Sequence, residues 1–120
     1  MKKFAFMTLS LLAVAAALPS AASAASDGKN RRIVVQNVSS QAIFYLYASP
    51  ITSSNWEEDL LGNSTISAGE ERTANIDNGT NQCQFDLKVK MANDREVIRR
   101  NVNICAVSRW VIGNSGDSVQ

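Results

Sequence analysis

Residues 83–91, Cys-Gln-Phe-Asp-Leu-Lys-Val-Lys-Met, decide the fold, because apolar and polar side chains alternate along them without a break. Successive side chains of a β-strand point to opposite faces of the sheet. The alternation therefore predicts a strand that buries one face and exposes the other.

A hairpin is predicted directly after this strand. Asn93 and Asp94 are typical of a two-residue turn, which would pair Ala92 with Arg95 and return the chain through residues 96–106. The apolar face of the returning strand is expected to carry three side chains, Ile98, Val102 and Ile104.

Two cysteines, Cys83 and Cys105, flank this hairpin, and we expect them to form a disulfide because the chain carries an export signal, described below. A redox-active thiol pair is the alternative, but it normally needs a Cys-x-x-Cys motif or an activating neighbour. The predicted register places Phe85 opposite Val102 and Val89 opposite Ile98, and it leaves Cys83 opposite Ile104 rather than Cys105. We therefore expect a β-bulge or a strand end just before Cys105.

Short runs of β-branched and aromatic residues predict further strands on both sides of the hairpin. The run at residues 42–48 is the richest in aromatic side chains and is expected to be a central strand. The remaining strands are expected at residues 31–38, 65–68, 71–76 and 107–112. About six to eight short strands without a helical pattern predict an all-β fold, either an antiparallel β-sandwich or a small barrel.

The N-terminus, residues 1–24, has the pattern of a cleavable signal peptide. Lys2 and Lys3 precede an apolar run at residues 4–18, and Ala22-Ser23-Ala24 offers small residues for cleavage before Ala25. The run is shorter than the roughly 20 residues of a membrane span. We expect a periplasmic or secreted protein without a transmembrane segment, in which residues 25–120 form a single β domain with an ordered core at about 31–112 and a frayed leader at 25–30.

Composition excludes several functions. Loss of Lys2 and Lys3 with the signal leaves ten basic side chains against eleven acidic ones, a net charge of −1, so nucleic acid is not an expected partner. The sequence contains no histidine, which excludes Ser-His-Asp and Cys-His catalysis and imidazole-bound metals. The glycines are scattered singly, so no phosphate-binding loop is expected.

The long loop at residues 49–62 holds the candidate binding residues, Asn55, Trp56, Glu57, Glu58 and Asp59. Ser54 or Asn55 is expected to cap one helical turn through these residues, after which Leu60 and Leu61 return to the core. Trp56 has two interpretations. It is either a recognition residue on a loop or a large apolar side chain that closes one end of the sandwich.

The charged side chains suggest three further candidate sites. Glu57, Asp59 and Asp77 are possible calcium ligands, although calcium takes about six to eight oxygen atoms and no calcium-loop motif is present, so no cofactor is expected. Glu57, Glu58 or Asp59, with a partner carboxylate elsewhere, is the candidate for a carboxylate-based hydrolase. Lys88, Lys90 and Arg99 are expected to share the outer face of the hairpin, either as a basic binding face or as an ordinary soluble surface.

Several segments resemble a group of small exported bacterial proteins, uncharacterised or called Tat-pathway signal proteins. The resemblance spans roughly residues 33–111, and its most specific part is Trp56 followed by Asp59-Leu60-Leu61-Gly62. It also rests on Tyr45-Leu46-Tyr47, Ser49-Pro50, Ser54-Asn55, Ala68-Gly69-Glu70 and Cys83 with residues 85–89. It implies an exported β-sandwich-like domain without an assigned activity.

The chain departs from that pattern at two positions. Glu57 stands where glycine is expected after the tryptophan, and Asn93-Asp94 stands where Asp-Gly is usual. The signal also lacks twin arginines, which favours the general secretion route.

The leading hypothesis is a non-enzymatic exported binding protein that contacts an envelope or extracellular macromolecule or ligand through residues 49–62. The alternative is a structural or inhibitor-like envelope protein whose interface is a sheet edge or the hairpin face. A calcium-binding module and a carboxylate-based hydrolase are the remaining hypotheses.

Overall fold

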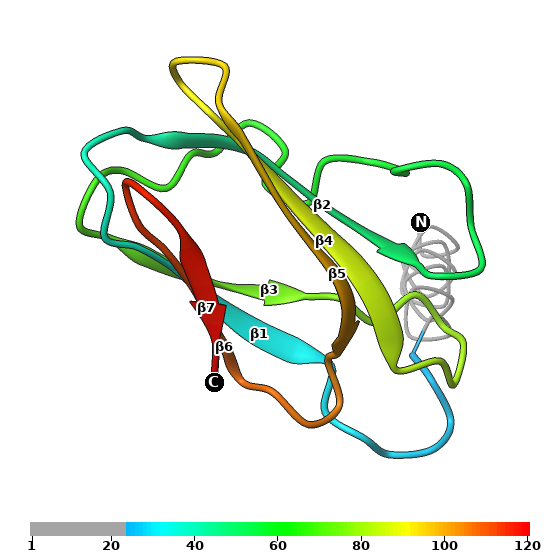
Figure 1. Ribbon diagram of the computed structural model, residues 1–120. Helices are drawn as coiled ribbons and strands as arrows, with labels where there is room; N and C mark the ends of the chain where they lie inside the picture. Colours follow the sequence, from blue (N-terminus) through cyan, green and yellow to red (C-terminus); the bar gives the residue numbers. More distant parts are fainter. Residues whose placement is uncertain (1–23) are drawn as a thin grey trace, which may run out of the picture.

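The computed structural model describes residues 24–120, so the predicted signal peptide lies outside the described residues except for Ala24. The described chain forms seven strands and no helix (Figure 1). The strands are β1 (Arg32–Asn37), β2 (Ile43–Pro50), β3 (Glu71–Asn75), β4 (Gln84–Met91), β5 (Glu96–Asn103), β6 (Arg109–Ile112) and β7 (Asp117–Val119).

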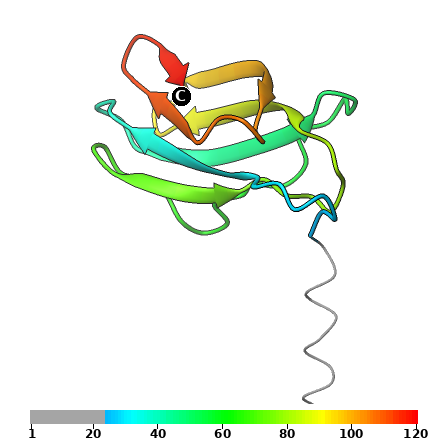
Figure 2. The same ribbon diagram turned by 90° about the horizontal axis from the view of Figure 1, so that it is seen from below.

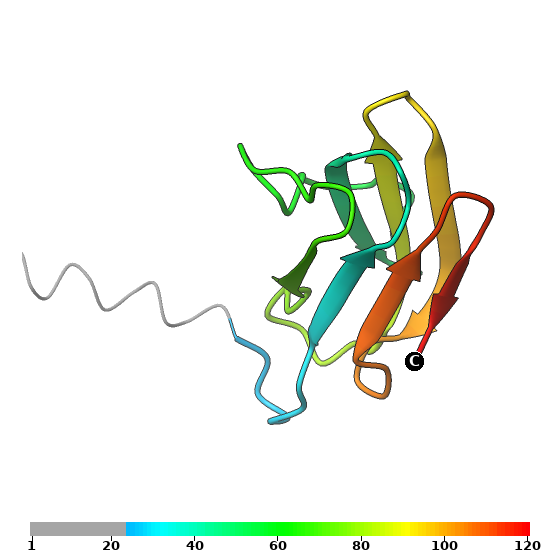
Figure 3. The ribbon, with the colours of Figure 1, turned by 90° about the vertical axis from the view of Figure 1, so that its left-hand side faces the viewer.

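The strands form two sheets, one with the order β3-β1-β6-β7 and the other with the order β2-β4-β5. The sheets face each other as the two layers of a sandwich (Figures 2 and 3). The predicted all-β fold is confirmed, and the sheets do not close into a barrel. All strand pairs are antiparallel except β1 and β6, which run parallel.

The hydrophobic core fills the space between the sheets. The alternation of residues 83–91 places Phe85, Leu87, Val89 and Met91 on the inner face of β4, each at most 1% exposed. Burial of this kind stabilises a fold by roughly 1.5–3 kcal/mol per large apolar side chain. The other fully buried side chains include Ile33, Val35, Ile43, Leu46, Ile66, Ile104, Trp110 and Ile112.

The hairpin turn is one residue longer than predicted. The amide of Met91 donates to the carbonyl of Arg95 (2.8 Å), and the amide of Asp94 donates to the carbonyl of Met91 (3.0 Å). This leaves a three-residue loop ending at Asp94, whose φ is +69°, as in hairpins that close with a left-handed residue. The expected pairing of Val89 with Ile98 is therefore wrong, because Val89 lies opposite Val97.

A β-bulge corrects this shift further along β5. Lys88 lies opposite Ile98 and Leu87 opposite Arg99, whereas Phe85 lies opposite Val102 as predicted. The extra residue keeps Val102 on the core face (4% exposed), while Ile98, expected in the core, lies on the outer face and is 40% exposed.

The disulfide between Cys83 and Cys105 is present, with a Cα–Cα distance of 5.4 Å. β5 ends at Asn103, so the predicted strand end before Cys105 is confirmed. The amide of Ile104 still donates to the carbonyl of Cys83 (2.9 Å), and the chain turns immediately afterwards. The turn lets Cys105 reach Cys83 although it is not directly opposite in the ladder.

Several predicted elements are wrong. β2 is an edge strand rather than a central one, and its outer face exposes Phe44 and Tyr45. Residues 65–68 form no strand but a single bridge between Ile66 and Ile43. Residues 113–120 lie outside the predicted core at 31–112, but they include β7, which pairs with β6.

The 49–62 loop lacks the predicted helical turn, and Leu60 is exposed while Leu61 returns to the core. Within residues 24–120, no helix is long and apolar enough to cross a membrane.

Candidate functional site

The 49–62 loop is fastened at two points to the sheet that contains β2. The Ser49 hydroxyl donates to the carbonyl of Asn55 (2.7 Å). Further along the loop, the Asp59 carboxylate accepts hydrogen bonds from the amides of Leu46 and Leu61 (both 3.0 Å). Charge-assisted bonds of this kind are stronger than neutral ones, so Asp59 is a structural anchor of the loop.

Trp56 lies between these two anchors, half-buried on the outer face of the sheet. The Lys88 ammonium nitrogen is 4.9 Å from the centre of its ring, and the Arg100 guanidinium carbon is 5.5 Å from it. Each cation at such a distance attracts the ring by about 0.5–1 kcal/mol at an exposed site. Trp56 is therefore held against the sheet by charged side chains, and it does not close the end of the sandwich.

Two tyrosines continue this surface along β2. Tyr45 and Tyr47 stack with ring centres 6.2 Å apart, and Lys88 lies 5.0 Å above the Tyr47 ring. Tyr47 faces Lys88 across the strand pair, and Tyr45 faces Lys90. The aromatic residues that suggested a central strand thus form an outer surface together with Lys88 and Lys90.

The bulge in β5 positions Arg100 beside Trp56. Arg100 and Asn101 both lie opposite Asp86, and Asn101 has a φ of +56°. The Asp86 carboxylate accepts hydrogen bonds from the Arg100 guanidinium (3.0 Å) and from the Asn101 amide (2.9 Å). Asp86 therefore fixes both the backbone of the bulge and the direction of the arginine.

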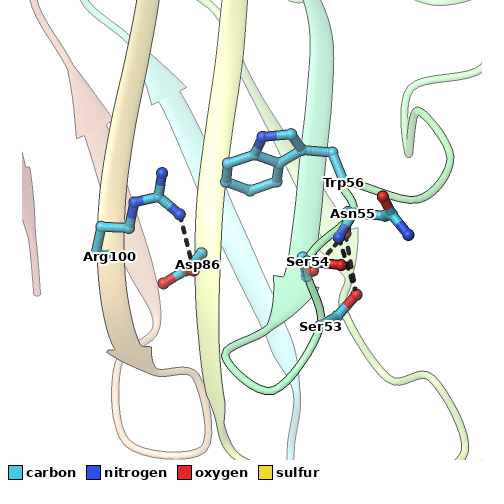
Figure 4. A pocket seen from close by; sticks show the side chains of 7 residues that line it. Ser53, Ser54, Asn55, Trp56, Asp86 and Arg100 are labelled. Atoms are coloured by element: carbon cyan, nitrogen blue, oxygen red, sulfur yellow. Dashed lines mark hydrogen bonds and ion pairs between the residues drawn. The ribbon is translucent and has the colours of Figure 1, made fainter.

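These residues enclose a hollow of about 150 Å³ at the base of the loop. Figure 4 shows Trp56 reaching from the loop across β4 toward Arg100, with Asp86 below the ring. The lining consists of one aromatic ring, one ion pair and several small polar side chains: Ser49, Ser53, Ser54, Asn55, Trp56, Asp86 and Arg100. Such a hollow presents one flat apolar wall together with hydrogen-bond donors and acceptors.

Glu57 and Glu58 face a different hollow, because the chain bends sharply after Trp56. Glu57 has a φ of +41°, in the left-handed region that favours glycine. Glu57, Glu58 and Asp77 line a separate space of about 240 Å³ near the turn that follows β3. The five candidate binding residues therefore separate: Asn55 and Trp56 lie on one side of the loop, the two glutamates lie on the other, and Asp59 anchors the loop.

The three calcium candidates do not form one ligand set. Glu57 and Asp77 share a hollow, but the Asp59 carboxylate is bonded to two backbone amides. Asp77 accepts hydrogen bonds from the amides of Ala25 and Gly79. Among residues 24–120, no group of three or more acidic or cysteine side chains is arranged to hold a metal ion.

Arg99 does not share the outer face with Lys88 and Lys90, so that placement is wrong. The three-residue turn brings Arg99 opposite the buried Leu87. Its Nε donates to the Asp117 carboxylate on β7 (2.7 Å), which bridges the two sheets. Arg100 takes the outer position instead, and sequence periodicity missed it because the bulge has no alternating signal.

Comparisons with protein-family models, with curated proteins and with solved structures each found no match to this chain. The resemblance to small exported bacterial proteins therefore stays a prediction.

Proposed function

We propose that the protein is a non-enzymatic exported binding domain that holds one ring-sized, hydroxyl-bearing unit, such as a single sugar of an envelope or extracellular glycan, in the hollow beside Trp56. The observation that carries this proposal is the meeting of Trp56, Asp86 and Arg100 in one small polar hollow. The flat ring suits the apolar face of a sugar, and the polar groups suit its hydroxyls.

The size and charge of the hollow support this class of ligand. Pockets for drug-sized ligands measure about 300–1,000 Å³, so about 150 Å³ suits a single ring. The charges nearly cancel, because Asp86 pairs with Arg100 and Glu96 lies 3.9 Å from the Lys88 ammonium. A neutral polar unit therefore suits the site better than a strongly charged one.

Export is part of the proposal and rests on the signal-peptide pattern and the disulfide. Disulfides persist in oxidising compartments such as the periplasm or the exterior of the cell. The Cys83–Cys105 bond is consistent with that address.

The proposed function is non-enzymatic because the carboxylates of the loop and of the hollow have other roles. Asp59 anchors the loop, and Asp86 fixes the bulge. Glu57 and Glu58 face away from Trp56 into the other hollow. The hydrolase hypothesis predicts an activity that is lost in Glu58→Gln or Asp59→Asn. Turnover of a substrate by the wild-type protein on a broad panel would support that hypothesis.

The alternative interface also has support from one observation. Phe44, Tyr45 and Ile98 on the β2-β4-β5 sheet are each about 40% exposed, which suits contact with another protein. However, both edge strands of this sheet, β2 and β5, are bulged, and β5 also carries Glu96 and Arg100; these features discourage edge pairing. We therefore rank the structural or inhibitor-like role second.

Binding can be tested with two defined probes, purified peptidoglycan sacculi in co-sedimentation and a glycan array, using mature wild type and Trp56→Ala. A central tryptophan contact contributes about 2 kcal/mol, so we expect the variant to lose roughly 30-fold in affinity. Arg100→Ala should weaken binding in the same direction. Phe44→Ala is the matched control, because it removes an exposed aromatic ring of the same sheet outside the hollow.

Three outcomes are informative. Loss of binding in Trp56→Ala but not in Phe44→Ala supports the proposal. Binding that survives Trp56→Ala contradicts the role of the hollow. Absence of binding to every glycan by folded wild type contradicts the ligand class.

A further inference from the structure

The segment that follows the predicted cleavage site is ordered by contacts to residues 76–83, contrary to the expected frayed leader. The Asp27 carboxylate forms two hydrogen bonds with the Arg31 guanidinium, of 2.8 and 2.7 Å. Arg31 is 2% exposed, and its Nε donates to the carbonyl of Gln82 (2.7 Å). The Ser26 amide donates to the side chain of Asn81 (3.1 Å). In Figure 1 this segment lies beside the turn after β3.

The first residue of this segment is bound by a carboxylate. The backbone nitrogen of Ala25 lies 3.1 Å from Oδ1 and 3.0 Å from Oδ2 of Asp77. Asp77 is 52 positions away in the sequence and is itself held by the Gly79 amide (3.0 Å). Ala25 is half-buried, whereas Ala24 is exposed.

This geometry suits a charged nitrogen better than a peptide amide. One amide N–H must be shared between two oxygens that lie at the same distance. An α-ammonium group has three N–H donors and a positive charge, so it can bond each oxygen separately and form an ion pair. The Ala22-Ser23-Ala24 pattern predicts that cleavage creates this group on Ala25.

We propose that Asp77 is the binding site for the α-ammonium group of a mature chain that begins at Ala25, so that signal removal converts the amide contact at this position into an ion pair. The ligand is thus the protein's own new N-terminus. The position of cleavage and the position of Asp77 are matched, because a chain starting one residue earlier or later would place its ammonium group elsewhere.

Other charged groups near Ala25 set the pH dependence. Asp27 and Arg31 pair with each other beside Asp77, and Glu57 and Glu58 line the adjoining hollow. Hydrogen bonds from the Gly79 and Ala25 amides lower the pKa of Asp77, so its carboxylate is charged at neutral pH. A bound ammonium group should have a raised pKa. Its contribution to stability is then complete below about pH 8 and is lost as the pH rises through the folded value.

The first experiment is an NMR pH titration of residues 25–120 with a free, isotope-labelled Ala25. We expect an α-amino pKa above the ordinary range of roughly 7.7–8.0. Asp77→Asn should return this pKa to the ordinary range, whereas Glu58→Gln, which removes a charge from the same hollow, should leave most of the elevation. An α-amino pKa within the ordinary range in folded wild type would overturn the proposal.

A second experiment does not depend on the folding of the Asp77 variant. Acetylation of Ala25, or retention of Ala24, should lower the Tm of wild type by an amount on the order of a few degrees. The same modifications should have little effect in Asp77→Asn where that variant folds. Equal Tm for the free and acetylated wild-type chains would contradict the inference, as would a purified exported protein whose mass shows a start other than Ala25.

Discussion

The two tryptophans of the chain differ in their place relative to the sandwich, since one lies between the two sheets and the other lies outside them. Trp110 on β6 is fully buried between the sheets, and its indole Nε1 donates to the Asp117 carboxylate (2.7 Å). Trp56 lies outside the other sheet, half-buried against Lys88 and Arg100. The first ring is held by packing and one hydrogen bond, and the second by two cations and a bent loop.

This difference shows that ring size alone does not decide whether a tryptophan belongs to the core. Trp110 follows the alternation of a strand whose other inner residue is Ile112. Trp56 belongs to a segment without periodicity, and Leu61 takes the core position that the loop supplies. An aromatic side chain that is not needed for the core can be offered to a ligand.

Truncation of each tryptophan should give the largest contrast. Trp110→Ala should lower the free energy of unfolding by about 3–5 kcal/mol, because it leaves a cavity in the core. Trp56→Ala should lower it by about 1 kcal/mol or less, since it removes surface cation–π contacts. Urea unfolding measures both values.

The milder pair Trp110→Phe and Trp56→Phe is the control in case Trp110→Ala does not fold. The order of the two effects should be preserved in this pair. Equal destabilisation in both pairs would show that Trp56 is a core residue and that the comparison is wrong.

Asp117 supplies a smaller effect that is specific to the buried tryptophan. Burial tends to raise the pKa of this carboxyl, but hydrogen bonds from Arg99 and Trp110 outweigh it and lower the pKa below its usual range. The group therefore adds stability above about pH 4, and this stability is lost as the pH falls through the lower folded value.

Asp117→Asn should cost about 1–2 kcal/mol at neutral pH, because a half-buried charged acceptor is replaced by a neutral one. It should also flatten the stability curve at acid pH. Asp94→Asn is the control, since the Asp94 side chain is 88% exposed. If the stability of Asp117→Asn falls at acid pH as much as that of wild type, then carboxylates other than Asp117 cause the pH dependence.

The sequence was sufficient for the core strand and the disulfide because both depend on local pattern and compartment. Residues 83–91 carry their alternation within one segment, and Phe85 faces Val102 as predicted. The face of Ile98 and Arg99 could not be predicted, because it depends on whether the turn holds two residues or three. The alternation restarts correctly at Val102 because the bulge adds the missing residue.

The candidate site was predicted as a segment but not as a set of residues. Trp56 could be named from its type and its place in a loop, whereas Asp86 and Arg100 come from other strands. The order in residues 25–31 depends on partners such as Asp77 and Asn81, more than 50 positions away, which local patterns do not reveal. The short strand β7 was missed because it has only three residues, of which Asp117 and Ser118 are polar, and so it gives no periodic signal.

The smallest expected effect concerns the backbone that presents Trp56. Both positions where glycine is expected from the family resemblance have positive φ, +41° at Glu57 and +69° at Asp94. A side chain with a Cβ is disfavoured in that region, so Glu57→Gly should stabilise the protein by about 0.5–1 kcal/mol in thermal or urea unfolding. Asp94→Gly should gain less, because aspartate tolerates this conformation better than glutamate. Glu58→Gly is the control, and it should be destabilising because Glu58 has no positive φ. A similar loss of stability in Glu57→Gly would show that the backbone at Glu57, which presents Trp56, is not strained.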